Sequence, residues 1–360
     1  MLDVSLDHVS FAPRNISDIT LTFAASRHTA LVGPPAGGAS TLLQLIAGKL
    51  RPTSGQVRIG NRVVNDLRES RRPLLYVTSA LDVPDRWSVR HALIAAVRRR
   101  TLDRIDRQLE YELAMEKWKL RPIADRSVGT LSGSERTLVH LARIELLRPG
   151  ILIADRLLER LNASGAEEVA DAFYRTLRVA GTTHVTAPAT RMELGATDHV
   201  IVLDGGRVVQ EGTAAQLHTT PLAEASAMAT GAINVVPVTI EGSSVDSIIG
   251  VWQVADPPFQ GSGVALVRPE AFRVVQGGEE SELIVAVEEA AFENGRWLVS
   301  AILSGGFSLR VSFPGDIRLH KGKLLALTYH AEGFALVQRE IETPRRSVPT
   351  DVVPPMRDSR

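Results

Sequence analysis

Apolar and polar residues alternate along the first part of the chain, which predicts short β-strands. Two alternating runs, 2–6 and 19–23, precede a continuous apolar run at 29–32 that predicts a buried strand. A glycine-rich segment, 33–41, follows this run directly. Beyond it, apolar residues recur at helical spacing until Gly48, so the sequence predicts a strand, a glycine-rich loop and a helix in succession.

In the middle of the chain, the spacing of apolar residues changes twice. Residues 86–147 are mainly helical in period and rich in Arg and Glu, and an apolar run that ends in Asp155 returns to a strand pattern. A helix at 166–179 and strands near His184 and at 200–203 continue an alternation of strands and helices. This alternation is typical of an α/β fold with a mainly parallel sheet and helices on both faces.

From about residue 236 onward, the segments are short and strand-like. Turn signals separate them, namely Gly-Ser at 242–243, Gly-Gly at 277–278 and Asn-Gly at 294–295. This pattern predicts a second, all-β domain with a barrel-like arrangement. The tail from residue 343 carries four prolines among charged residues, and we expect it to be disordered.

Composition and charge limit the classes of function. The chain has 360 residues, 44% hydrophobic and 23% charged, which is ordinary for a globular protein of two or three domains. Its 41 basic residues equal its 41 acidic ones, so no nucleic-acid partner is expected. The three arginines at 98–100 are interpreted as a solvated helix end rather than a binding patch. The absence of cysteine excludes disulfides, thiolate zinc sites and cysteine nucleophiles.

No segment of the sequence predicts direct insertion into a membrane. The N-terminal segment contains an acid and alternates like a strand, unlike a signal peptide. No stretch approaches the roughly 20 uncharged apolar residues that a membrane helix requires. A role at a membrane would therefore depend on a partner.

The glycine-rich segment has the features of a phosphate-binding loop. The backbone N–H groups of such a loop converge on one point at a helix N-terminus, and glycines let the backbone approach the phosphates. Ser40 is placed to put a hydroxyl on Mg²⁺, but Ala39 stands where the usual pattern has the lysine that reaches the β- and γ-phosphates. Taken alone, the segment fits a Gly/Pro turn between a strand and a helix equally well.

Other segments stand in a recognisable order around this loop. The run Leu131-Ser132-Gly133-Ser134-Glu135 precedes a predicted helix and resembles the LSGGQ signature of ABC ATPases. In a dimer of that family, the signature holds the γ-phosphate bound by the other subunit. The strand 151–155 resembles the Walker B strand, whose acid holds Mg²⁺, and 161–163 takes the place of the D-loop. The segments 47–57 and 203–213 also resemble their counterparts in the family.

A further resemblance lies in the all-β region. The run Leu266-Val267-Arg268-Pro269-Glu270 resembles the IRPE stretch of the TOBE domain on ATPase subunits of sugar and polyol importers. The resemblance covers about residues 1–340 and implies a P-loop NTPase (RecA-like) fold with an inserted helical subdomain, followed by an OB-like domain. The implied divisions are a nucleotide-binding domain over 1–232 with its helical subdomain at about 86–147, a TOBE domain over 233–342 and a tail over 343–360.

The resemblance implies ATP and Mg²⁺ as cofactors and assigns residues to them. Asp155 and Ser40 are the implied Mg²⁺ pair, although a lone Asp at a strand end is also often a cap or an ion-pair partner. Phe11 is a candidate for stacking on adenine, or else an ordinary core residue. The remaining implied nucleotide contacts are Gly33, Pro34, Gly37, Gly38, Ala39, Ser40 and Thr41, the last of these for the α-phosphate.

Several positions depart from the family's pattern. Besides Ala39, they are Thr78 for the Q-loop glutamine, Arg156 for the glutamate that polarises the attacking water, Asn162 for the D-loop aspartate and Ala187-Pro188 for the switch histidine. His184 lies three or four residues too early to replace that histidine. Arg156 cannot orient and deprotonate water, but its charge is a candidate to replace part of the missing lysine charge.

These departures predict a degenerate subunit. We expect the chain to pair with a second, catalytically competent ABC ATPase, to which it offers Ser132 and Gly133. The segment 80–87 is expected to face transmembrane permease subunits, with a solute-binding protein as an indirect partner. The implied setting is the cytoplasmic face of the plasma membrane, as a peripheral subunit of a carbohydrate, polyol or glycerol-like importer. The alternatives are an ordinary homodimeric transport ATPase and a scaffold that no longer binds nucleotide.

Overall fold

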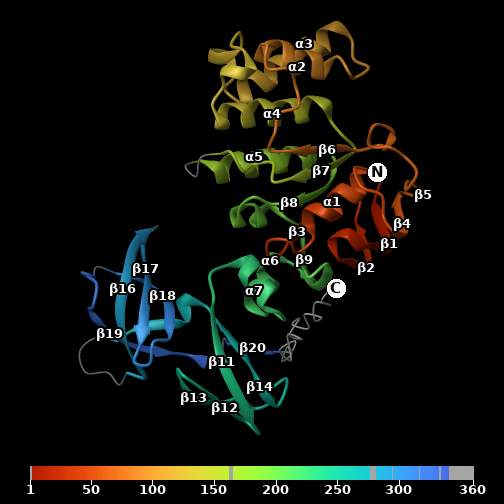
Figure 1. Ribbon diagram of the computed structural model, residues 1–360. Helices are drawn as coiled ribbons and strands as arrows, with labels where there is room; N and C mark the ends of the chain where they lie inside the picture. Colours follow the sequence, from red (N-terminus) through yellow and green to blue (C-terminus); the bar gives the residue numbers. More distant parts are fainter. Residues whose placement is uncertain are drawn as a thin grey trace, which may run out of the picture.

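Four β-sheets organise the residues that the computed structural model describes, which are 2–161, 165–275, 281–293, 295–315, 317–331 and 334–339. Helices α2, α3 and α4 lie at one end of the molecule, and the strands from β11 onward lie at the other (Figure 1). The central sheet lies between these two parts and carries the glycine-rich loop.

The central sheet has six strands in the order β10-β9-β3-β8-β7-β6. All neighbouring strands are parallel except the pair β9–β10, so the prediction of a mainly parallel sheet with helices is confirmed. The strands are β3 (His28–Val32), β6 (Leu75–Thr78), β7 (Ile151–Asp155), β8 (Thr183–Ala187), β9 (His199–Asp204) and β10 (Arg207–Gly212).

One face of the central sheet is covered by helix α1 (Ala39–Ala47) and by an antiparallel sheet of order β2-β1-β4-β5. In strand β7, successive residues pack on opposite faces of the sheet. Ile151 and Ile153 pack towards α1, whereas Leu152 and Ala154 pack towards the opposite face, because successive side chains of a strand point to opposite sides. The strands of the antiparallel sheet are β1 (Val4–Phe11), β2 (Ile16–Phe23), β4 (Ser54–Ile59) and β5 (Arg62–Val63).

Helices cover the opposite face. The helices within residues 86–147, a region predicted to be mainly helical, share an apolar core with the later helix α5 and with strands β6 and β7. These helices are α2 (Val89–Val97), α3 (Arg104–Lys117), α4 (Gly133–Leu147) and α5 (Ala166–Val179), joined by short 3₁₀ turns. Helices α6 (Ala214–Thr219) and α7 (Glu224–Thr230) pack on the same face beside β3 and β9. Among the described helices, none combines the length and apolar character that a membrane crossing requires.

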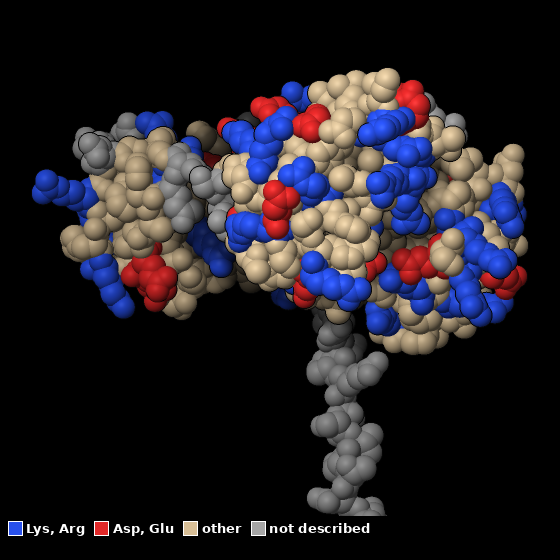
Figure 2. Space-filling model, turned by 90° about the horizontal axis from the view of Figure 1, so that it is seen from above, with Lys and Arg blue, Asp and Glu red and all other residues tan. Residues whose placement is uncertain are grey.

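The three arginines at 98–100 lie at the C-terminal end of α2. Arg98 is the C-cap of the helix, and Arg100 forms an ion pair with Glu110 of α3 at 3.4 Å. Figure 2 views the molecule from the side of these helices, and Lys and Arg side chains are more prominent than Asp and Glu on this face.

The C-terminal region is all-β in its described residues, as the sequence predicts. Two five-stranded antiparallel sheets, β13-β12-β11-β14-β20 and β15-β19-β16-β17-β18, share one apolar core. The predicted turn at 277–278, Asn294 and the tail 343–360 lie outside the described residues. The strands are β11 (Asn234–Glu241), β12 (Ser244–Ser247), β13 (Gly250–Gln253), β14 (Gly261–Val267), β15 (Phe272–Val274), β16 (Leu283–Glu293), β17 (Arg296–Leu303), β18 (Ser308–Pro314), β19 (Leu324–Tyr329) and β20 (Ala335–Gln338).

Arg268, in the segment that resembles the IRPE stretch, connects this region to α6 and α7. Its guanidinium donates to the carbonyl oxygen of Ala227 at 2.8 Å and to the Thr230 hydroxyl at 2.8 Å, both in α7. It also donates to the carbonyl oxygens of Ala232 and His218, each at 3.2 Å. A cation that binds carbonyls at the end of a helix satisfies groups that the helix leaves without partners.

Candidate functional site

The glycine-rich loop connects β3 to α1, as the sequence predicts. Helix α1 begins at Ala39, and Gly38 before it has φ 114°, a left-handed conformation that glycine adopts without strain. The loop closes on itself through the N–H of Gly37, which donates to the Pro34 carbonyl oxygen at 2.8 Å. The start of α1 is thereby fixed beside the carboxyl end of β3.

The first loop glycine is required by close packing. A Cβ on Gly33 would lie 2.0 Å from the carbonyl oxygen of Leu203 in β9, and one on Gly37 would lie 2.8 Å from the same oxygen. No side chain fits at such distances. Gly33 and Gly37 therefore let the loop lie directly against the end of β9.

A cavity of about 790 Å³ lies against this loop. It brings together residues from the loop, from the segment after β7 and from the end of β8. The predicted site residues in its lining are Gly33, Pro34, Gly37, Gly38, Ala39, Ser40, Thr41, Arg156, Ala187 and Pro188. Phe11, Thr78, Asp155 and the signature run 131–135 are not part of that lining.

Asp155 lies directly behind the loop, at the end of β7. The Ser40 hydroxyl donates to one oxygen of its carboxylate at 2.9 Å, and the Tyr76 hydroxyl lies 3.4 Å from the other. Burial, followed by the charge of Asp155, raises the pKa of Tyr76 to about 12, so the phenol stays protonated and can donate. Tyr76 was not expected from the sequence. It lies in β6 two residues before Thr78 and pairs with Ile153 of β7.

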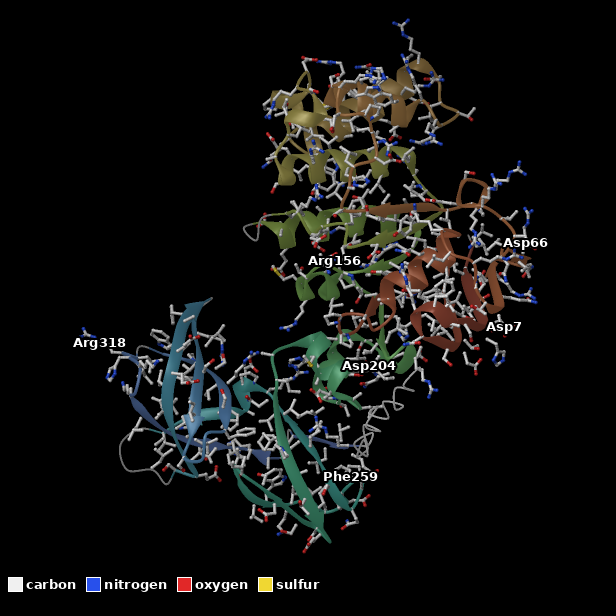
Figure 3. All side chains as sticks on the ribbon, in the orientation of Figure 1. Asp7, Asp66, Arg156, Asp204, Phe259 and Arg318 are labelled. Atoms are coloured by element: carbon white, nitrogen blue, oxygen red, sulfur yellow. The ribbon has the colours of Figure 1, made fainter. Side chains whose placement is uncertain are left out.

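Arg156 projects from a strained turn after β7 (Figure 3). Its φ of 52° is left-handed, and its N–H donates to the carbonyl oxygen of Ala187 at 2.8 Å, which fixes the turn to the end of β8. The guanidinium donates to the Glu159 carboxylate at 2.7 Å. Part of the Arg156 charge is therefore already compensated, which weakens its case as a substitute for the missing lysine.

Two further arginines line the cavity and were not found from the sequence. Arg14 lies in the 3₁₀ turn η1 (Ala12–Arg14) between β1 and β2, and Arg191 begins the turn η5 (Arg191–Ala196) after β8. Neither forms an ion pair with a carboxylate in the described part of the chain. No sequence signal marks them, because each approaches the loop only through the tertiary fold.

Three other predicted residues lie around the cavity rather than in it. Phe11 pairs with Ile16 across the β1–β2 ladder and packs, half-buried, against the core below α1. Thr78 lies beside Asp155 in the central sheet, and its hydroxyl accepts from the N–H of Ala80 at 3.2 Å. His184 is fully buried in β8 among aromatic rings. Asn162 lies outside the described residues.

The signature run begins helix α4 through a reciprocal cap. Ser132 is the N-cap; its hydroxyl oxygen accepts from the N–H of Glu135 at 3.2 Å, and the Glu135 carboxylate accepts from the N–H of Ser132 at 2.7 Å. This second bond holds the pKa of the Glu135 carboxyl below its usual value. Arg126 pairs with the same carboxylate at 2.8 Å and balances its charge.

The residues around the loop fit a nucleotide and a metal in part. Gly38 and the N-terminus of α1 offer backbone donors, and the Ser40 hydroxyl and the Asp155 carboxylate are the oxygen ligands that Mg²⁺ prefers. Ser40 and Asp155 would hold Mg²⁺, which would neutralise phosphate charge. The missing element is a side-chain cation in α1, since Ala39 cannot reach a phosphate.

The loop itself permits a test of its geometry through Ala36, which has φ 66°. A left-handed non-glycine residue is strained by about 1–2 kcal/mol, and the greater unfolded-state freedom of glycine offsets about 0.5–1 kcal/mol of any relief. Ala36→Gly should therefore raise the free energy of unfolding by about 0.5–1 kcal/mol in urea titrations. The matched control, Ala172→Gly inside α5, should lower it by about 1 kcal/mol. Destabilisation by both variants would contradict the left-handed conformation of Ala36.

The fold and the loop are similar to those of ABC-type ATP-binding cassettes. A family model described as "ABC transporter" matches residues 16–158. Among solved structures, the dimeric ATP-binding cassette MJ0796 bound to ADP and Pi aligns with a TM-score of 0.50 at 20% identity, over 58% of this chain and 98% of that one. CbiO1 from Clostridium perfringens, part of the ABC transporter complex cbiONQ, aligns with a TM-score of 0.51 at 21% identity, over 58% and 88%. Similarity at this level of identity concerns the fold.

The sequence is similar to those of several import ATP-binding proteins. The sn-glycerol-3-phosphate import ATP-binding protein UgpC of Rhizobium meliloti (strain 1021) is 31% identical over 207 residues, which are 57% of this chain and 59% of that protein. UgpC 3 of Agrobacterium fabrum is 25% identical over 89% of this chain and 92% of its own length. The Fe(3+) ions import ATP-binding protein FbpC of Escherichia coli O157:H7 is 28% identical over 75% and 78%. The chain is therefore similar, in fold and in sequence, to ATP-binding proteins of ABC transporters.

Proposed function

We propose that the chain is the ATP-binding subunit of an ABC importer, that it holds nucleotide at its own phosphate loop without turnover, and that it completes the active site of a competent partner. The observation that carries this proposal is the convergence of three substitutions on one cavity. Ala39, Arg156 and Pro188 come from three separate segments, and all line the space beside the loop. Each stands where the resemblance places a group that acts on the γ-phosphate or on the attacking water.

The signature run supports a role in a partner's site. The Ser132 hydroxyl accepts one bond from the Glu135 N–H, and its own proton remains available to a phosphate oxygen. The start of α4 also carries the positive end of the helix dipole, which favours an anion. Arg126 compensates the Glu135 carboxylate, so the negative charge that replaces the family's glutamine is balanced.

The names of several relatives support a proposal for the transported solute and the setting. Several are named for sn-glycerol-3-phosphate import, and these cover both the α/β region and the all-β region of this chain. We infer a polyol or glycerol-like solute, permease subunits that contact the exposed segment around Asp82 and Asp85, and a solute-binding protein that delivers the solute. The subunit would then lie at the cytoplasmic face of the plasma membrane. The all-β region from about residue 233 is proposed to be a TOBE domain.

A nucleotide titration tests the proposal. Purified chain should bind ATP in the presence of MgCl₂ with saturable stoichiometry, and nucleotide recovered from the complex after prolonged incubation should still be ATP. The reason is that the loop backbone and the Ser40–Asp155 pair persist while the catalytic groups are replaced. Recovery of ADP would favour an ordinary homodimeric ATPase. No binding at all would favour a scaffold and overturn the proposal.

A further inference from the structure

Three arginines from separate segments reach the cavity beside the phosphate loop, namely Arg14, Arg156 and Arg191, and no Asp or Glu occurs among the described residues that line it. We propose that Arg14 supplies the phosphate-binding cation that is missing at Ala39, so that the cavity holds a nucleotide polyphosphate without a divalent metal. The inference rests on the proposed function, since it takes a nucleotide to be the ligand.

Arg14 reaches the start of α1 from the side. Its guanidinium lies 3.4 Å from the Thr41 hydroxyl and 3.3 Å from the side-chain oxygen of Gln44. Both partners are neutral, so the Arg14 charge is not compensated by its hydrogen bonds. An uncompensated guanidinium beside converging N–H groups favours an anion, and its planar fork matches two phosphate oxygens.

The turn that carries Arg14 is fixed to the phosphate loop. Gly206, between β9 and β10, accepts from the N–H of Ser17 at 3.1 Å and donates its own N–H to the Gly37 carbonyl oxygen at 3.2 Å. A Cβ on Gly206 would lie 1.9 Å from the carbonyl oxygen of Asn15, so the two segments are in direct backbone contact. The Arg14 backbone therefore needs little rearrangement to present its side chain to a phosphate.

The other two arginines have weaker claims to the lysine's role. Arg156 is already paired with Glu159 at 2.7 Å. Arg191 begins η5, beyond the end of β8, and makes no hydrogen bond to α1 in the described part of the chain. Both add positive potential to the site, whereas Arg14 alone contacts the first two turns of α1, where phosphates are expected.

Positive side chains around the cavity support binding without a metal. Arg14 and Arg191 form no ion pair with a carboxylate in the described part of the chain, and Arg156 adds a third guanidinium whose charge Glu159 compensates in part. Guanidinium groups can supply positive charge that a metal otherwise brings to a polyphosphate.

Calorimetric titration of the full chain with ATP, once with MgCl₂ and once with EDTA, tests the inference. The wild-type chain should bind ATP with comparable affinity in both buffers. Arg14→Gln should weaken binding in EDTA by about tenfold or more, because a charge-assisted hydrogen bond is lost, and Arg14→Lys should recover most of it. ADP should lose affinity as well, because it keeps the β-phosphate that the missing lysine of the family's pattern would contact. The matched control is Arg62→Gln, an exposed arginine of β5 far from the loop, and it should leave binding unchanged.

The outcomes separate the two proposals. Binding of ATP with MgCl₂ but not with EDTA, together with an unchanged affinity for Arg14→Gln, would overturn the role of Arg14 and leave the proposed function in place. Absence of ATP binding in either buffer would overturn the proposed function itself. Urea unfolding of each variant separates loss of affinity from loss of fold, and the exposed position of Arg14 predicts no loss of fold.

Discussion

Purified alone, the chain should hydrolyse ATP at least about 10⁴-fold more slowly than an ABC ATPase with intact motifs. A positioned charge or general base contributes about 10²–10⁴ in rate, and losses within one site are not additive. Ala39, Arg156 and Pro188 line the same cavity, so under the proposed function all three substitutions affect the same reacting atoms. Phosphate release at saturating ATP measures the rate, and a Ser40→Ala/Asp155→Asn variant gives the background from contaminating enzymes.

Restoring the three groups together should raise this rate by about 10²-fold or more. The variant combines Ala39→Lys, Arg156→Glu and Pro188→His, whereas Ala39→Lys alone should leave the rate near that of the parent chain because the base is still missing. Adding Ser132→Arg to the triple variant should abolish the gain, since a homodimer of that variant needs the signature run. A parent chain that already turns over at rates typical of intact family members would contradict the proposal.

The spacing of apolar residues predicted helices and strands well where burial alone determines that spacing. Helix α5 has the predicted bounds, because its buried residues Ala170, Phe173, Tyr174 and Leu177 recur at helical spacing. The strand β7 could be predicted because it is buried on both faces and its residues are all apolar up to Asp155. Neither prediction requires knowledge of what each element packs against.

The antiparallel sheet beside α1 shows that alternation predicts strands but not which strands pair. Alternation predicted strands near 2–6 and 19–23, but β1 also pairs with β4, which lies about fifty residues further along the chain. The same pattern of alternation is compatible with many pairings. The division of the C-terminal strands into two sheets could not be predicted for the same reason.

In the candidate site, too, some residues could be predicted from the sequence and others depend on tertiary packing. The loop 33–41 and Asp155 could be found because each follows a strand and has a known spacing from other motifs. Tyr76 and Arg14 could not, because their places depend on how β6 and the β1–β2 turn pack against α1. The alanine at position 39 is therefore visible in the sequence, whereas the approach of Arg14 to the loop is visible only in the fold.

A second large effect is expected in acid, through a buried histidine cluster beneath the site. His28 of β3 lies with its ring centre 4.4 Å from the rings of both Tyr174 and His184. The His28 Nδ1 donates to the Ala196 carbonyl oxygen at 3.1 Å, and its Nε2 accepts from the Thr186 hydroxyl at 3.0 Å, which fits a neutral ring. Burial lowers the pKa of His28 well below its ordinary value.

Burial lowers the pKa of two more histidines. In both cases, His184 in β8 and His140 in α4, the pKa falls to about 4. The unfolded chain takes up protons near pH 6.5, while the folded chain resists them until about pH 4. The free energy of unfolding therefore falls as the pH drops through this window. At about pH 5 the loss is about 2 kcal/mol for each histidine, since one pKa unit corresponds to about 1.4 kcal/mol.

Other charged groups around the cluster modify this loss without reversing it. Burial raises the pKa of the Glu193 carboxyl, so its neutral form stabilises the folded chain as the pH falls, in the opposite sense to the histidines. Asp198 raises the pKa of His184 and Arg178 lowers it, and both effects are smaller than that of burial. The net expectation is a decline in stability between about pH 6.5 and 4, slightly reduced at its acid end.

His184→Asn provides the decisive measurement. An asparagine keeps an N–H donor for the Thr182 carbonyl oxygen, which His184 bonds at 2.9 Å, but it does not titrate. Urea unfolding at about pH 7.5 and pH 5 should show a pH-dependent loss that is smaller by about 2 kcal/mol in this variant. The exposed His320→Asn should keep the full loss. Identical pH dependence in the two variants would show that His184 is not held neutral by burial, and the acid sensitivity would then have to arise outside the cluster.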